Sequence, residues 1–371
     1  MVQMETLTSL FKQKKNSIIN NTVLFVMSYL MVFYVVQIST FLSAFTHGVP
    51  MVLYTHEIDF SHVNSAASGD VWTSADNVIA IFGMAVIAVI ILSITAVLLL
   101  TRWQTDKLQI KRFLFWIFIC SFVRLSSNFI VGHISHLWNI NLVTDFMGIT
   151  YPGNLGKTIF IIVLILLTAA GFYWSSSLIK YILNPYAGRL KDSVKTDILV
   201  PAIIGIVIVN LFFIPFKPAF TWMEVLAAVM LLGGMIGIMF PVVLKRYRFV
   251  EESEESEESV LIDDERINLP LLFIVLGMMI VVKVIFDGGL FCDVSPYRNY
   301  FLENVILLSL GLIIIGFLIY LYISYKKKEK KRAKLEDSFL DDIESVDSTI
   351  SDEQWGQKKY DLSKYKDWDK D

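Results

Sequence analysis

The stretch YTHEIDFSH, residues 54–62, places a glutamate directly after a histidine, a pairing that is typical of zinc hydrolases. His56 and Glu57 form this pair, and His62 follows six residues after His56. In an HExxH motif the second histidine comes four residues after the first, so that both face one metal from a helix. Phe60 holds that position here. A six-residue step turns a helix by about 240° and separates the two imidazoles, whereas a strand or loop could direct both toward one ion.

A second histidine pair lies in GHISH, where His133 and His136 have the three-residue spacing of neighbours on a helix. The five histidines of the chain come from only two places, the first loop and the end of the third predicted span. Neutral imidazoles and carboxylates are ligands that zinc takes. Two interpretations stay open: interfacial histidines without a metal, or a composite zinc site of His133 and His136 with His56 or His62, for which Glu57 is a further candidate ligand.

An apolar helix that runs into a His-Glu stretch near the N-terminus, followed by further spans, resembles the front of the site-2-type membrane metalloproteases. The resemblance covers at most the first four predicted spans. The sequence departs from the family at Phe60 and has no intact Asn-Pro-x-x-Gly or Asp-Gly ligand motif, because Asn154 in YPGNLG stands in the wrong order. The family binds its metal inside the membrane, whereas these histidines are predicted outside it. The resemblance implies a diverged relative without protease activity.

Polar side chains within the apolar runs form a second candidate set. Arg124 lies near the middle of the third span, where an arginine costs about 2.5–3.5 kcal/mol on insertion scales and is turned toward partners. Asn128 lies one turn farther along, and Asn210 is expected at a similar depth in the fifth span. No acid is expected at that depth, so Arg124 is predicted to reach the interface or to bind something anionic.

Three more charges are expected nearer the outer face. Lys283 and Asp287 are four residues apart and can pair on one helix, with Glu224 as a third member. This group is interpreted either as an ion pair that packs two spans together or as part of a path for a substrate or ion.

The elements that carry these residues are predicted to be transmembrane helices. The chain is 55% hydrophobic and only 18% charged, below the roughly 25% of soluble domains. We therefore predict an all-α, polytopic membrane protein. Its eight expected spans are Asn21–Phe45, Asn77–Leu100, Phe113–Ser135, Thr158–Ile179, Ile198–Phe216, Phe220–Leu244, Leu269–Ile285 and Val305–Ile323.

Lysine and arginine are concentrated in alternate connecting segments, which predicts that both termini are cytoplasmic. The predicted organisation is a cytoplasmic segment 1–20, a transmembrane domain 21–323 and a charged tail 324–371. Within the domain, an outer loop 46–76 without lysine or arginine contrasts with an acidic cytoplasmic loop 246–267. The acidic loop and most of the tail are predicted to be disordered, because repeated like charges cannot bury a core.

The tail ends in an aromatic and basic stretch that is interpreted either as a solvated tail or as a docking peptide for a protein partner. The lipid bilayer is the other expected partner, and no nucleic-acid signature occurs. The two cysteines, Cys120 and Cys292, make no disulfide framework. Compact loops and a composition rich in isoleucine, lysine and asparagine favour a bacterial inner membrane.

Three functions remain compatible with the sequence. A non-enzymatic accessory or scaffold subunit of a membrane complex is favoured, because catalytic motifs are missing and the tail is suited to docking. A diverged metal-binding, hydrolase-like protein would use the histidines and zinc. A secondary transporter would use the intramembrane charges.

Overall fold

The computed structural model describes residues 2–60, 74–103, 107–135, 143–144, 153–182, 195–214, 218–243 and 267–292. The chain divides into two units, Met1–Asn299 and Tyr300–Asp371, and all described residues belong to the first. The eighth predicted span, the tail and nearly all of the loop 246–267 therefore lie outside the described residues.

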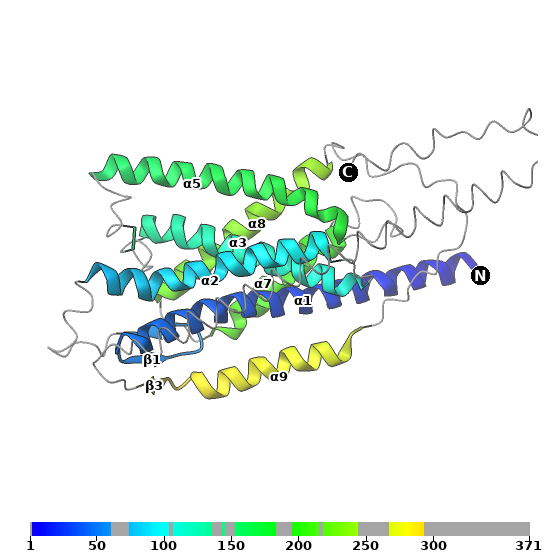
Figure 1. The fold of residues 1–371 in the computed structure, drawn as a ribbon. Coiled ribbons are helices and arrows are strands. Elements are labelled where there is room, and N and C mark those ends of the chain that lie inside the picture. Colours follow the sequence, from blue (N-terminus) through cyan, green and yellow to red (C-terminus); the bar gives the residue numbers. More distant parts are fainter. Residues whose placement is uncertain are drawn as a thin grey trace, which may run out of the picture. The chain divides into compact units, whose positions relative to one another are not determined.

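The described chain is dominated by helices, as predicted, and each of the first seven expected spans coincides with helical structure (Figure 1). The helices are α1 (Val2–Thr46), α2 (Ala75–Arg102), α3 (Leu108–Ser135), α5 (Gly153–Ser175), η2 (Ser176–Tyr181), η3 (Lys195–Leu199), α7 (Val200–Phe212), α8 (Pro218–Val243) and α9 (Leu269–Phe286).

Five segments of the described chain are long and apolar enough to cross a membrane: Lys15–Thr46, Ala75–Arg102, Leu108–Ile130, Gly156–Ile179 and Leu269–Phe286. Two shorter apolar segments, Thr196–Phe212 and Ala227–Met239, accompany them. The protein is therefore helical and embedded in a membrane.

The first helix is longer than the first predicted span. It begins at Val2 rather than near Asn21, because no glycine or proline interrupts the chain before Gly48. The helix ends at Thr46, where Gly48 takes the left-handed φ of 69°. Val49 N then donates to the carbonyl of Ala44, which satisfies one carbonyl at the helix end. The predicted N-terminal segment 1–20 is thus helical from Val2 and continuous with the first apolar span, which begins at Lys15.

α1, α2 and α3 pack against one another along their lengths and form the centre of the bundle. α7 packs on α1, while α8 contacts both α3 and α5. α9 contacts α1 (Figure 1). The core between these helices is rich in aromatic side chains, with Trp116, Phe25, Phe33, Phe115 and Phe213 among the largest that are fully buried.

Three aromatic rings lie directly over glycines of a neighbouring helix. Phe25 of α1 covers Gly205 of α7, and a Cβ at Gly205 would overlap this ring. In the same way, the Phe122 ring covers Gly171 and the Phe172 ring covers Gly234. Lipid tails are as apolar as side chains, so membrane helices associate through close packing and polar bonds. These glycines permit the close packing.

A small sheet at one end of the bundle is a feature that the all-α prediction missed. Its strands are β1 (Met51–Leu53), β2 (Ile58–Asp59) and β3 (Leu290–Cys292), all antiparallel, in the order β2-β1-β3. The strands are only two or three residues long, too short for a recognisable alternating pattern. The sheet joins the first predicted outer loop to the chain that follows α9, and we call this end of the bundle the strand end.

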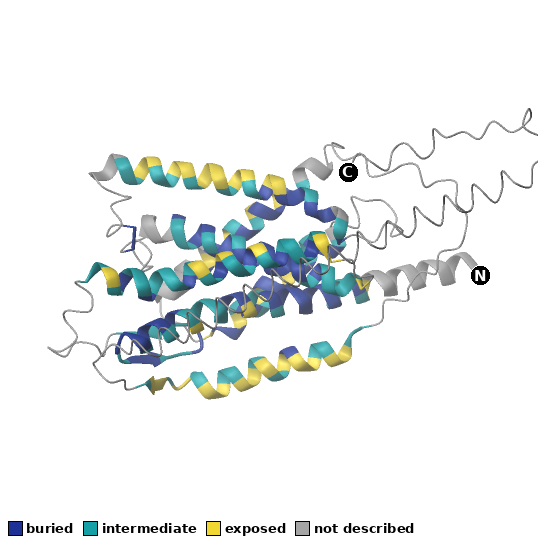
Figure 2. Ribbon diagram, viewed as in Figure 1, coloured by how far each residue is buried: buried dark blue, intermediate teal, exposed yellow. Residues whose placement is uncertain are grey.

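α5 and α9 have broad apolar surfaces that the rest of the described chain does not cover (Figure 2). Val275 is the only residue of α9 that is buried. On α5, large side chains from Ile159 to Leu167 are about half exposed. In a membrane these surfaces face lipid or another helix.

The contact between Phe25 and Gly205 predicts a sharp response to a single methyl group. Gly205→Ala should destabilise the protein by about 1–3 kcal/mol, the usual cost of overpacking a core. Gly233→Ala is the matched control, because no atom lies within 4 Å of a Cβ placed there. Thermal unfolding of both variants in detergent gives the comparison. Equal stability of the two variants would contradict the packing described between α1 and α7.

Candidate functional site

The centre of the bundle holds a buried ion pair between α3 and α8. Arg124 Nη1 donates to Glu224 Oε1 at 2.7 Å, and the Tyr29 hydroxyl of α1 donates to the other oxygen of the same carboxylate. The Arg124 guanidinium also lies over the Phe33 ring, 4.9 Å from its centroid. We call these residues the central joint, because their side chains bond three helices together.

This arrangement corrects two sequence predictions. We expected no acid at the depth of Arg124, and we expected Glu224 to lie beside Lys283 and Asp287 nearer the outer face. Both predictions were wrong, because the relative depth of α3 and α8 depends on packing that the sequence does not give. Asn210 donates its side-chain amide to the Ile206 carbonyl of its own helix at 2.9 Å. Asn128 is half-buried on α3.

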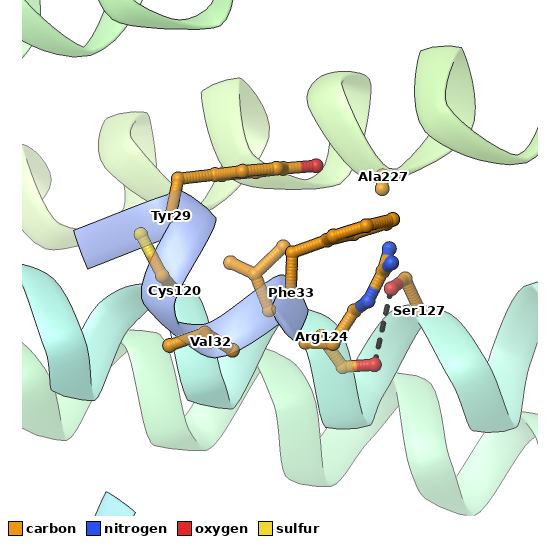
Figure 3. Close-up of a pocket in the computed structure, with 8 residues that line it drawn as sticks. Tyr29, Val32, Phe33, Cys120, Arg124, Ser127 and Ala227 are labelled. Atoms are coloured by element: carbon orange, nitrogen blue, oxygen red, sulfur yellow. Dashed lines mark hydrogen bonds between the residues drawn. The ribbon is translucent and has the colours of Figure 1, made fainter. Parts of the chain in front are cut away.

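A cavity of about 10 Å³ lies beside the central joint, enough for about one water molecule. Figure 3 shows the Arg124 side chain next to the Phe33 ring, with the Ser127 hydroxyl bonded to the Arg124 carbonyl at 3.2 Å. The lining is mainly apolar and comes from α1, α3 and α8. Its residues are Tyr29, Val32, Phe33, Cys120, Val123, Arg124, Ser127 and Ala227. This cavity has no room for an organic substrate.

A second charged group, the far-end joint, lies at the end of the bundle opposite the sheet. Arg112 Nη2 of α3 donates to Asp197 Oδ2 at 3.2 Å, and the guanidinium also donates to the Ile182 carbonyl at 3.3 Å. Ser17 of α1 donates to the other oxygen of Asp197 at 2.7 Å. Both charged side chains are buried. The far-end joint therefore ties α1 and α3 to η3 and to the chain that follows η2.

The far-end joint was not predicted from the sequence. Arg112 was counted only as one of the basic residues that orient the chain, and Asp197 was not considered. One signal was available: Asp197 is an acid immediately before an apolar run, in a connection otherwise rich in positive charge.

The predicted pair of Lys283 and Asp287 is confirmed, with Nζ and Oδ1 3.2 Å apart. Lys283 Nζ also donates to the main-chain carbonyls of Phe212, at 3.0 Å, and Ile214. Thr55 Oγ1, in the turn between β1 and β2, donates to Asp287 Oδ1 at 3.2 Å. We call this group the strand-end joint, and it attaches α9 to the end of α7 and to the small sheet.

The predicted zinc ligands are only partly within the described chain. His56 and Glu57 lie in the turn between β1 and β2, with His56 Nε2 3.7 Å from Glu57 Oε1. His133 belongs to the last turn of α3, but its side chain is outside the described set, as are His62 and His136. Among the side chains that are described, no three or more His, Cys, Asp or Glu residues lie close enough to hold a metal ion.

His47 is a histidine that the predicted zinc set did not include. It follows the end of α1 and is buried, and its Nδ1 lies 2.7 Å from the Ser43 carbonyl. Because a carbonyl can only accept, Nδ1 carries the proton and Nε2 is left with its lone pair. Nε2 has no hydrogen-bond partner within the described part of the chain. A histidine whose Nδ1–H is held by a carbonyl has the tautomer of a metal ligand.

No protein-family model, curated protein or solved structure matches this chain. The class of this protein is therefore defined by its own helices and by the contacts between them. It is a helical membrane protein in which charged side chains at three levels bond the helices to one another.

The central joint predicts unequal effects for two conservative variants. Glu224→Gln leaves the Arg124 charge buried without its counter-charge, and breaking a buried pair from one side costs about 3–5 kcal/mol. Tyr29→Phe removes one hydrogen bond to a charged group, which is worth about 1.5–3 kcal/mol. We expect Glu224→Gln to have the lower unfolding temperature in detergent. A Glu224→Gln protein as stable as the native chain would contradict the ion pair.

Proposed function

We propose that this protein is a non-enzymatic accessory or scaffold subunit of a membrane complex. In this proposal the chain crosses a bacterial inner membrane eight times, with both termini in the cytoplasm. The observation that carries the proposal is that the buried charged side chains bond helices to one another. At the central and far-end joints, arginine and carboxylate bond to each other and to neighbouring helices, so their polar groups stabilise a frame.

The packing around the central joint favours a structural role for Arg124 and Glu224 rather than a role in transport. A transporter that used Arg124 and Glu224 would need space beside them for its substrate and for a change of partners. The adjoining cavity has room for about one water molecule. Phe33 further encloses the Arg124 guanidinium by lying against it.

The frame leaves surfaces for partners. The apolar flanks of α5 and α9 suit the lipid bilayer or another membrane helix. The tail 324–371 carries Trp355, Tyr360, Tyr365 and Trp368 among charged residues, and aromatic side chains are enriched where proteins bind one another. We therefore assign the docking of a cytoplasmic protein partner to the tail.

Deletion of the chain after Lys334 tests the scaffold proposal. We expect the tagged full-length protein, purified from its native membrane in mild detergent, to bring a partner in stoichiometric amount. The truncated protein should lose this partner and keep its unfolding temperature, because the three joints lie before residue 293. A full-length protein that purifies alone from cross-linked membranes would contradict the proposal.

A second candidate function is metal binding at the strand end. The specific observation in its favour concerns the buried His47. Its Nδ1 is held by the Ser43 carbonyl, and its Nε2 has no hydrogen-bond partner within the described part of the chain, so this nitrogen has a lone pair for a metal. His56 and Glu57 lie in the neighbouring loop, and His133 ends α3, which packs on α1 and α2. In this proposal His47 and His56 hold zinc together with ligands from His62, His133 and His136, whose side chains lie outside the described part of the chain.

Metal content decides this second candidate. The protein is purified without a histidine tag, and zinc, iron, copper and manganese are measured per chain by mass spectrometry. The metal proposal expects about one zinc, retained by Lys15→Met and lost in a His47→Ala, His56→Ala variant. If the native chain contained no more zinc than the double variant, the metal proposal would be overturned.

A further inference from the structure

The strand-end joint contains a set of oxygen atoms that suits a cation. α7 ends at Phe212, and the carbonyls of Phe212 and Ile214 lie beyond its last regular hydrogen bonds. The residue four positions after Ile214 is Pro218, which has no N–H to offer. The Ile214 carbonyl therefore has no helical N–H donor at that position, and both carbonyls lie at the negative end of the α7 dipole.

A carboxylate, held by a hydroxyl, completes the set. Asp287 Oδ1 lies 3.2 Å from Lys283 Nζ, and Thr55 Oγ1 lies 3.2 Å from the same carboxylate oxygen. Carbonyl oxygens at broken helix ends, combined with acids, coordinate sodium in membrane transporters. The ammonium of Lys283 now lies where such an ion would lie, within hydrogen-bonding distance of both carbonyls and the carboxylate.

We propose that the strand-end joint is an oxygen set built for a monovalent cation, which the Lys283 ammonium fills in the native chain and a metal ion such as Na⁺ fills when the ammonium is removed. The charge balance supports this assignment: one positive charge offsets the Asp287 carboxylate and the two carbonyl dipoles. The Lys283 side chain is 29% exposed and that of Asp287 is 40% exposed, so an ion from solvent can reach these oxygens once the ammonium is removed.

The tethered ammonium would also hold α9 in place. Only Val275 of α9 is buried, so the polar bonds at the two ends of the helix carry much of its attachment. At the far end, Asn268 accepts from Leu271 N and bonds Gln109 of α3 and Asn20 of α1. At the strand end, the Lys283 ammonium provides the bond by donating to the carbonyls at the end of α7. Removal of the ammonium should therefore make the stability of the protein depend on the cation supplied.

The test compares unfolding temperatures in NaCl, KCl and choline chloride at equal ionic strength. Lys283→Met removes the ammonium and keeps an unbranched side chain. We expect this variant to be less stable than the native chain in choline, and to gain about 2–4 °C in one of the metal salts with a saturable dependence on concentration. The native chain should respond equally to all three salts. The control Lys15→Met, which removes an exposed lysine of α1, should do the same.

Two further variants keep the test decisive. Lys283→Met with Asp287→Asn should lose the response, because the set then lacks its carboxylate. Lys283→Ala also removes the ammonium and leaves no donor on the two carbonyls, so it replaces Lys283→Met if that variant does not fold, and it should show the same preference for a metal salt. Equal unfolding temperatures of the folded Lys283 variant in all three salts would overturn the proposal.

Discussion

The bond between Arg124 and Glu224 constrains the rest of the bundle. An arginine in the middle of an apolar helix must be neutralised, because hydrocarbon offers it neither water nor a counter-charge. Glu224 provides that charge from α8, and Tyr29 adds a hydrogen bond from α1. Once these three side chains meet, the depth and rotation of their helices are fixed. The aromatic rings around them, such as Phe33, pack within that geometry.

The other two joints extend the same principle to the ends of the bundle. Arg112 and Asp197 bond α1, α3 and η3 at the far end, and Lys283 bonds α9 to the end of α7 at the strand end. Between the joints, phenylalanine rings lie over glycines, as Phe172 does over Gly234. Such close packing matters in a membrane, where the hydrophobic effect gives little drive for one helix to prefer another over lipid. A scaffold subunit needs this kind of frame.

The sequence predicted the elements well and their contacts poorly. Seven of the expected spans coincide with helices because long apolar runs have one stable form in a bilayer. The pair of Lys283 and Asp287 was also predictable, since its spacing lies within one helix. The partner of Arg124 was not, because Glu224 is 100 residues away in sequence. The short strands and the tautomer of His47 likewise depend on tertiary contacts.

The most direct test of the account is a double-mutant cycle on the central joint, with Arg124→Met, Glu224→Leu and the combined variant compared by free energy of unfolding. If the pair is a structural bond, each single variant leaves a buried charge uncompensated, and the combined variant is more stable than either one. If the scaffold proposal holds, the combined variant also still binds the protein partner proposed for the tail. Additive losses in the cycle would show that the two charges act independently, and they would contradict the central claim.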